Sequence, residues 1–384
     1  MLYGIILPTT HTHIPKRKKQ KERNKRKKQK ETYFNVTMAY SKPIHAAVLT
    51  FSCFAEGHVG MKIEQNQIAK DGKNRALTYD DVRALYLKLG NYSEDDGSGD
   101  CTRFFTLRQD IGSREPNACV LVLRDGMRLL GVDKDVLLNQ IQNLPVVDKQ
   151  MLNTRQKKVM NKNKRHNCNF GDQIIQADIA NGQSTMYNFK CTFLSEAKKL
   201  RDAFTKMGKE NRLETMTDLL AEANIYYADE FKKNNYCGIG YHGDAERPNS
   251  PVIGCNVGNT RYLSFRSFHR SRYYRDETRI QLNHGDIYFM SEHAVGVNWK
   301  KSSQVVFRHR AGSLKFLEKD DKDRQRRWAL AEKKANAKKS NASDELEKKR
   351  KKDVVQVIDY TEDVVRGGKK YKKVVTYVPM VDLT

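Results

Sequence analysis

The sequence predicts an α+β fold built around an antiparallel barrel or sandwich within residues 224–312. Short apolar runs broken by Gly, Asn and Pro fill this stretch, at residues 252–258, 262–265 and 286–290. Brief β-prone runs bounded by turn residues are typical of antiparallel sheets. Helical patterns occur upstream of this stretch, and both ends of the chain are dominated by charge.

The chain has 384 residues and a formal net charge of +25, with 38% hydrophobic and 30% charged residues. This length has room for two domains and a sizeable core. The positive charge favours DNA or RNA as the partner. The basic run 16–30, with eleven Lys/Arg and one acid, has no apolar face for a membrane. A solubilising tail is the alternative interpretation of that run.

The seven cysteines form no CxxC pair, which indicates reduced thiols in an intracellular protein. No apolar run is long enough to span a membrane. The basic run can serve as a nuclear localisation signal. We therefore expect a monomeric, intracellular and nuclear protein that does not bind membranes.

Composition divides the chain into five expected segments. Residues 1–38 read as a disordered basic arm and residues 40–150 as an accessory α+β domain. The main domain is expected at residues 151–316. The charged residues 317–352 predict a helical or disordered segment. Two β-prone runs around a Gly-Gly pair predict a short β-hairpin tail at residues 353–384.

Local patterns place several elements before the barrel. Thr78 precedes a helical pattern that stops at Gly90, and Ser195 is expected to cap a helix. Leu residues and Met216 at helical spacing predict a further helix at residues 211–223. The other expected elements are a buried strand at 46–51, paired strands at 102–107 and 119–123, and a helix at 135–144.

A His-x-Asp pair, His242 and Asp244, stands on an early strand of the barrel stretch. Side chains at i and i+2 of a strand share one face. Two His and one carboxylate on one face of a metal ion are the ligands of non-haem Fe(II) oxygenases. A structural His–Asp hydrogen bond is the alternative.

Arginines near the end of the stretch are candidate ligands for anions. Arg308 and Arg310 have the same strand parity, and a planar guanidinium suits a carboxylate co-substrate. Arg266 and Arg270 interleave with aromatic residues, a pattern that suits phosphate contact and base stacking. The alternatives are an exposed basic strand and core aromatics with outward arginines.

These motifs resemble the AlkB-like Fe(II)/2-oxoglutarate-dependent dioxygenases over about residues 153–312. Four local matches carry the resemblance. They are His242 with Asp244, the strand 306–312 with Arg308 before Ala-Gly, Asn224 with Tyr226, and a lid-like segment containing Lys162, Arg165 and Phe170. The whole pattern is similar to AlkB-like proteins of large DNA viruses and microbial eukaryotes.

The resemblance implies a double-stranded β-helix, or jelly-roll, core with flanking helices. It implies oxidative demethylation of N-alkylated nucleobases in DNA or RNA, with Fe(II) and 2-oxoglutarate as cofactors and no catalytic residues beyond the metal ligands. Asn224, Tyr226, Arg308 and Arg310 would bind 2-oxoglutarate. Nucleic acid would contact Lys162, Arg165, Phe170, Arg266 and Arg270. A catalytically degenerate nucleic-acid-binding protein and a protein hydroxylase of the same fold are the alternatives.

Two features depart from the family pattern. The family spacing for the second iron His falls near Trp299, where no His stands. We expect His293, fifteen residues before Arg308, to complete the triad. His309 and an incomplete triad are the alternatives, and His309 has strand parity opposite to Arg308. Ser302 replaces one family arginine, so that contact is missing or is supplied by Arg310.

Overall fold

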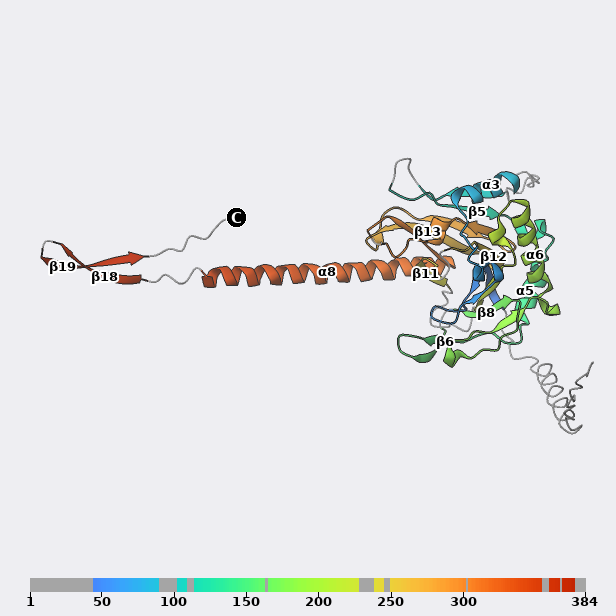
Figure 1. Cartoon of the computed structure of the whole chain (residues 1–384), viewed down its shortest axis with the longest axis horizontal. Helices are drawn as coiled ribbons and strands as arrows, with labels where there is room; N and C mark the ends of the chain where they lie inside the picture. Colours follow the sequence, from blue (N-terminus) through green and yellow to red (C-terminus); the bar gives the residue numbers. More distant parts are fainter. Residues whose placement is uncertain are drawn as a thin grey trace, which may run out of the picture. The chain divides into compact units, whose positions relative to one another are not determined.

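A computed structural model describes residues 44–89, 102–108, 114–162, 165–227, 238–244, 249–301, 303–353, 359–366 and 368–376 (Figure 1). The chain forms two units, Met1–Leu317 and Glu318–Thr384. The expected basic arm, residues 1–38, lies outside the described residues.

An eight-stranded sheet runs through the first unit in the order β4-β5-β16-β12-β1-β10-β8-β9. Every neighbouring pair is antiparallel except β8 with β9. Strand β1 lies in the middle, where Leu49 is opposite Ala223 on one side and Cys255 on the other. The strands are β1 (Ile44–Ser52), β4 (Arg103–Thr106), β5 (Cys119–Leu123), β8 (His166–Gly171), β9 (Met186–Asn188), β10 (Leu220–Tyr227), β12 (Val252–Gly258) and β16 (Ile287–Met290).

A second sheet packs face to face with the first. Its order is β11-β17-β13-β14, and β15 also pairs with β13. An apolar layer joins the two sheets, with Val122 and Tyr288 from the first sheet against Phe265 and Phe307 from the second. The strands are β11 (Gly238–His242), β13 (Arg261–His269), β14 (Arg272–Tyr273), β15 (Thr278–Leu282) and β17 (Val306–Gly312).

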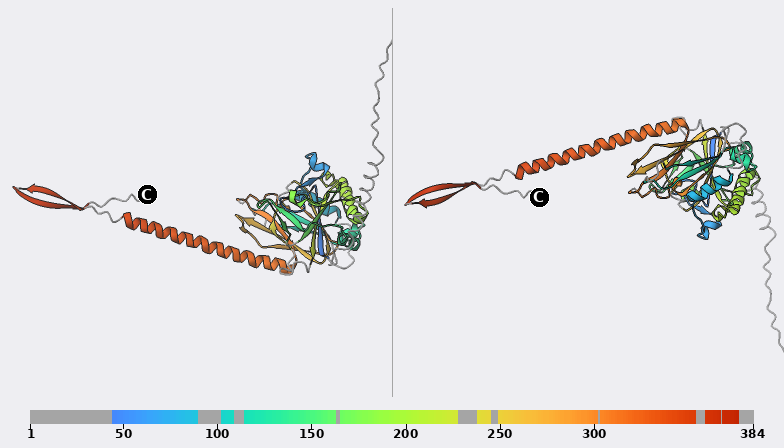
Figure 2. Two further views of the ribbon diagram at one scale, coloured as in Figure 1. Left: turned by 90° about the horizontal axis from the view of Figure 1, so that it is seen from below. Right: turned by 90° about the horizontal axis from the view of Figure 1, so that it is seen from above.

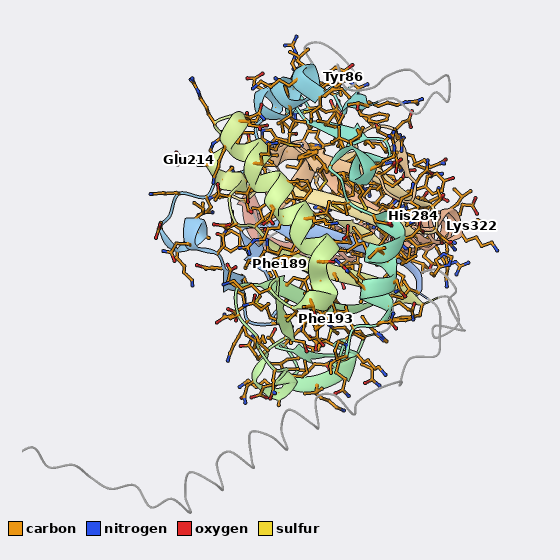
Figure 3. All side chains as sticks on the ribbon, turned by 90° about the vertical axis from the view of Figure 1, so that its right-hand side faces the viewer. Tyr86, Phe189, Phe193, Glu214, His284 and Lys322 are labelled. Carbon is orange, nitrogen blue, oxygen red and sulfur yellow. The ribbon has the colours of Figure 1, made fainter. Side chains whose placement is uncertain are left out.

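Helices cover the other face of the eight-stranded sheet, away from β13 (Figures 1 and 2). Helix α6 (Ser195–Glu210) buries Leu200 and Phe204 on one face, the spacing of an amphipathic helix. Phe204 packs on Phe51 of β1, with ring centroids 5.1 Å apart. Figure 3 looks onto this face, where α6 runs from near Phe193 toward Glu214. Helices α3 (Tyr79–Leu89) and α5 (Lys134–Gln142) complete the layer.

Shorter elements fill the connections. They are β2 (Phe54–Ala55), β3 (Glu64–Gln65), β6 (Gln150–Asn153), β7 (Lys158–Asn161), α2 (Gln67–Lys70), α4 (Gly126–Leu129), α7 (Glu292–Val295), and the 3-10 turns η2 (Ile179–Asn181), η3 (Thr192–Leu194) and η4 (Glu214–Met216). The described cysteines are free thiols, in line with the prediction. Among the described helices, none is both long and apolar enough to cross a membrane.

The charged C-terminal part contains helix α8 (Leu314–Asp353) and a hairpin of β18 (Asp359–Arg366) and β19 (Lys369–Thr376). Both lie where the sequence predicts a charged helical segment and a short hairpin. The strand and helix predictions at 46–51, 102–107, 119–123, 135–144 and after Thr78 are also confirmed.

Three predictions need correction. Residues 40–150 are not a separate domain, because β1, β4 and β5 belong to the same sheet as β8 and β10. The helix expected at residues 211–223 is instead η4 followed by β10. All eight residues of β10 are buried, and a strand buried on both faces loses the alternation that identifies it. Ser195 is the first residue of α6 and does not cap it, since Leu194 holds the cap position.

Candidate metal centre

Two imidazoles and a carboxylate meet between the sheets at the end of β11. His242, Asp244 and His309 each offer one ligand atom, and these atoms lie within 4.8 Å of one another. The Oδ1 of Asp244 is 3.3 Å from Nε2 of His242 and 3.5 Å from Nε2 of His309. Metal–ligand bonds of about 2 Å fit these separations. The cluster could therefore hold a metal ion.

A bulge in β11 brings the two histidines together. Ile239 is opposite Ala311, but three residues later His242 is opposite His309, only two residues away on β17. The extra residue in β11 is a β-bulge, which re-aims the side chains that follow it. Gly243 follows the bulge and lies against Trp299, where a Cβ would be only 2.6 Å from the ring and would not fit.

Hydrogen bonds orient the ligands. The Nδ1 of His242 bonds the carbonyl oxygen of Gly240 at 2.8 Å, which leaves its Nε2 for a metal. The Nδ1 of His309 is buried and has no hydrogen-bond partner among the described residues. Asp244 is nearly buried, and its backbone N–H donates to the carbonyl oxygen of Val295 at 3.2 Å.

The members of the cluster shift one another's pKa values toward the charged forms. Burial alone would raise the pKa of Asp244, but the imidazoles of His309 and His242 outweigh it and hold that pKa well below its usual range. Burial alone would lower the pKa of His242, but the hydrogen bond and charge of Asp244 outweigh it and raise that pKa. The carboxylate is thus kept ionised, as a metal ligand must be.

His309 replaces His293 as the third member of the cluster. His293 lies on α7, where its Nε2 is 3.7 Å from Glu292 Oε1, and it lines a surface pocket with His269 and Tyr274. His309 does have the opposite parity to Arg308. However, the cluster lies on the His309 side of β17, so Arg308 is the residue that points away from it.

The two arginines of β17 are held on the outer face of the second sheet. Arg310 is fully buried, and its Nη2 and Nε donate to Glu277 Oε1 at 2.6 and 3.0 Å. Its guanidinium also lies 4.5 Å from the ring centre of Tyr241. Arg308 donates to the carbonyl oxygen of Trp299 at 3.4 Å. Neither arginine is placed to bind a co-substrate at the cluster.

Asn224 and Tyr226 do lie on the face of β10 that looks toward the second sheet. Arg261 of β13, only 1% exposed, stacks over Tyr226 with its guanidinium carbon 3.7 Å from the ring centre. Sequence reasoning missed Arg261 as a site residue. Arg261 stands two and four residues before Leu263 and Phe265, a spacing that puts the three side chains on one face of the strand. In the structure that face packs against the first sheet.

The residues expected to contact nucleic acid separate into three places. Lys162 is buried and donates to the carbonyl oxygen of Gly57 at 3.2 Å. Arg165 is half-buried and close enough that its charge opposes protonation of His242. Phe170 cannot stack on a base, because it is fully buried on the opposite face of β8, 6.0 Å from the Phe189 ring.

The last two expected contacts lie away from the cluster. Arg266 is opposite Arg308 and stacks over Tyr273 at 4.0 Å, on the outer face of the second sheet. Arg270 is exposed in the turn between β13 and β14, with a φ of 48°. Neither residue therefore lines the metal cluster.

The fold and site define a β-rich α/β protein with a His-Asp-His cluster between two packed sheets. No known family model matches the chain. Over 276 residues it is 34% identical to "Uncharacterized protein R156" of Acanthamoeba polyphaga mimivirus, covering 70% of this chain and 96% of that protein. The chain therefore belongs to the family of this mimivirus protein. That name states no activity.

Proposed function

We propose that the protein is an Fe(II)/2-oxoglutarate-dependent oxygenase that demethylates N-alkylated nucleobases in DNA or RNA. The His242–Asp244–His309 cluster carries the proposal. Two imidazoles and one carboxylate on one side of the metal leave the other side open for a co-substrate and dioxygen. A complete ligand set weighs against a catalytically degenerate protein.

Strand pairing supports a jelly-roll core. The pairs β11–β17, β12–β16 and β13–β15 are antiparallel and nested. The first strand of this run pairs with the last, the second with the last but one, and the third with the last but two. Nested pairing of eight strands is what builds a jelly roll. Strand β10 precedes this run, and its partner is β1 from the N-terminal part of the chain. We infer that β1 serves as the eighth strand.

Arg261 and Tyr226 suit the distal carboxylate of 2-oxoglutarate. Arg261 places a buried guanidinium on the inward face, and its planar fork can bind a carboxylate through two hydrogen bonds. Tyr226 is the residue that the AlkB resemblance assigns to the same co-substrate, and the two side chains are stacked. Arg261 would thus supply the contact that Ser302 and Arg310 do not.

Bound Fe(II), with 2-oxoglutarate and dioxygen, would supply the oxidation, in which an N-methyl group is hydroxylated and lost as formaldehyde while succinate and carbon dioxide form. The protein holds His242 in one ring orientation through Gly240 and buries His309 and Asp244 away from water. The target base must leave its stack to reach the cluster.

Coupled release of succinate and formaldehyde from methylated oligonucleotides tests this function. We expect turnover with Fe(II), and His242→Gln should reduce it to background. His284→Gln is the matched control, because His284 bonds Asp135 away from the cluster. Absence of turnover by iron-loaded protein on methylated DNA and RNA, with turnover on peptides, would favour a protein hydroxylase.

A further inference from the structure

A basic hollow opens beside the C-terminal end of helix α6. It has a volume of about 430 Å³, within the range of about 300–1,000 Å³ that is usual for small-molecule sites. Four cations line it, namely Lys73, Arg75, Lys209 and Arg212. Figure 3 labels another lining residue, Glu214, on the helix-covered face of the eight-stranded sheet. The hollow is therefore separate from the metal cluster, which lies between the two sheets. We call it the basic hollow.

Two segments that are far apart in the sequence are joined where the basic hollow forms. The backbone N–H of Arg75 donates to Thr215 Oγ1 at 3.1 Å, and that hydroxyl donates to the carbonyl oxygen of Arg75 at 2.7 Å. Thr215 is 2% exposed, so these bonds are shielded from water. Gly208 also lines the hollow, and a Cβ there would lie only 2.8 Å from the carbonyl oxygen of Leu213 and would not fit. The cations are therefore carried by a closely packed frame.

Arg212 keeps its place in the hollow in a strained backbone conformation. It follows Asn211, the C-cap residue of α6, and its φ of 56° is in the left-handed region. Its N–H donates to the carbonyl oxygen of Lys209 at 3.3 Å. The N–H of Leu213 donates to the carbonyl oxygen of Gly208 at 2.7 Å. In this Schellman motif the left-handed position is usually glycine, because other residues are strained there. Strained residues cluster at functional sites, so the arginine indicates a role for its side chain.

The protein does not balance the charges of the basic hollow. Among the described residues, Arg75 forms an ion pair with Asp81, and the other three cations of the lining form none. Glu214 is the acid that belongs to the lining. Four cations against these two carboxylates leave two positive charges at one hollow. Lys209 suits the C-terminal end of α6, but Lys73 and Arg75 come from a different segment and converge on the same place.

The chemistry of the lining defines its ligand. None of the described residues that line the hollow is aromatic or a large apolar residue, so it has no surface on which a base or an acyl chain would pack. It offers the N–H donors of lysine and arginine, which bind phosphate oxygens. The excess of two positive charges requires an anion of at least that charge.

We propose that the basic hollow binds a compact ligand with adjacent phosphate groups, a di- or triphosphate chain. The planar guanidinium of Arg212 would bind two phosphate oxygens, and the lysines would act as point charges. A free polyphosphate compound and the 5′-triphosphate end of a nucleic acid share this chemistry. The inference does not depend on the proposed oxygenase activity, because the metal cluster takes no part in it.

Lysine footprinting with inorganic tripolyphosphate tests the site. Full-length protein is acetylated briefly with and without this ligand, and the modification of each lysine is quantified by mass spectrometry. We expect saturating tripolyphosphate to slow the acetylation of Lys73 and Lys209 by about fivefold or more. Lys158, an exposed lysine of β7, should react at an unchanged rate. Equal protection of all three lysines, or protection of none, would overturn the proposal.

Two arginine-to-glycine variants separate binding from folding. Arg212→Gly removes one cation and relaxes the backbone. It should raise the tripolyphosphate concentration that half-protects Lys209 about tenfold, without lowering the midpoint of thermal unfolding. Arg270→Gly is the matched control, because Arg270 is also exposed with a left-handed φ, 48°, but lies in the turn between β13 and β14. It should keep the wild-type concentration, and an equal change in both variants would overturn the assignment.

Two further variants test the sign of the charge effect. Glu214→Gln removes the opposing carboxylate and should strengthen binding about two- to fivefold. Lys73→Gln removes a cation of the other segment and should weaken binding as Arg212→Gly does, which provides the comparison if that variant does not fold. Weaker binding by Glu214→Gln, or unchanged binding by Lys73→Gln, would contradict the proposal.

Short oligonucleotides distinguish the two sources of the phosphate chain. A nucleic-acid end is the source if a strand with a 5′-triphosphate protects Lys209 at least as well as tripolyphosphate does, and a free compound is the source if it protects less well. In both cases the same strand with a 5′-hydroxyl should give no protection. Equal protection by the two strands would show that the hollow binds a strand backbone and would overturn the proposal. Stronger protection by citrate than by tripolyphosphate would overturn the choice of phosphate.

Discussion

Arg261 places its guanidinium carbon 3.7 Å from the centre of the Tyr226 ring, at a position that is 1% exposed. A planar guanidinium on the inward face can bind the carboxylate of a co-substrate through two parallel hydrogen bonds. The role proposed for Arg261 can be separated from general stability by changing the ligand as well as the protein.

We predict that Arg261→Gln specifically weakens recognition of the distal carboxylate. Wild type with bound metal should bind 2-oxoglutarate on the order of ten- to a hundredfold more tightly than 2-oxobutyrate, which lacks that carboxylate. Arg261→Gln should lose most of this difference, while Arg308→Gln should keep it. Calorimetric titration measures all six affinities. If only Arg308→Gln lost the difference between the affinities for 2-oxoglutarate and 2-oxobutyrate, Arg308 of β17 and not Arg261 would bind the distal carboxylate.

Lys162 gives a pH dependence with a defined sign. Burial lowers its pKa from 10.5 to about 8, against the opposing charge of Asp148. Between these two pH values the folded protein binds fewer protons than the unfolded chain, so stability should rise with pH. Below about pH 8 the penalty for burying the charge is fully present.

We therefore predict that Lys162→Met is more stable than wild type at pH 7. The difference between the two proteins should shrink as pH rises from about 8 to 10.5. Lys158→Met, which changes an exposed lysine on β7, should follow wild type. Denaturant unfolding at a series of pH values measures this, and a constant difference would show that Lys162 titrates normally.

Strand β17 has two faces with different tasks. His309 and Phe307 face the first sheet, whereas Arg308 and Arg310 face outward. The outer arginine Arg310 forms a buried ion pair with Glu277. Removing one partner of a buried pair leaves an uncompensated charge, which is strongly destabilising. Arg310 thus stabilises the fold through this buried pair.

We predict that Glu277→Gln lowers the free energy of unfolding by about 3–5 kcal/mol. Metal content and 2-oxoglutarate affinity of the folded protein should not change. Asp202→Asn is the matched control, because it breaks an exposed pair with Lys198 and should cost less than about 1 kcal/mol. Loss of co-substrate affinity at full stability would contradict the structural role.

Local sequence signals were enough for helix α3, which has one apolar face, and for strands β4 and β5, which are short runs of β-prone residues. They were not enough for the fully buried β10, because apolar spacing alone cannot separate a buried strand from a buried helix. The pair His242 and Asp244 was found from its i, i+2 spacing, and both belong to the cluster, although β11 ends at His242.

The third member of the cluster depends on non-local pairing. His309 meets His242 only because a bulge shifts the register between β11 and β17. Arg261 meets Tyr226 across the two sheets. Alternation along one strand shows which side chains share a face, but it does not show which face points toward the core. The strands and sheet that pack against it decide this, and they are distant in the sequence, so the motifs could not predict it.

At the scale of the first unit, strand β1 from the N-terminal part of the chain completes the eight-stranded sheet, one face of which looks toward the metal cluster. Strand β1 lies between β10 and β12, with Val48 opposite Asn224 and Asn256. Its pairing joins residues that are far apart in the sequence, which makes folding depend on long-range contacts. A domain cut at residue 150 would leave this central position empty.

We predict that residues 151–317 do not fold alone. Without β1, β10 and β12 would expose unpaired strand edges in the middle of the sheet. Residues 44–317, which keep the strand, should unfold cooperatively. Circular dichroism and thermal unfolding of the two fragments test this, and a cooperative transition in the shorter fragment would show that residues 40–150 are accessory after all.

The metal content of protein purified without oxygen and supplied with Fe(II) tests the cluster most directly. Two imidazoles and one carboxylate should retain about one iron per chain in wild type. His309→Gln should lose it, whereas His293→Gln should retain it as wild type does. Iron that depends on His293 and not on His309, or its absence from wild type, would contradict the His242–Asp244–His309 site.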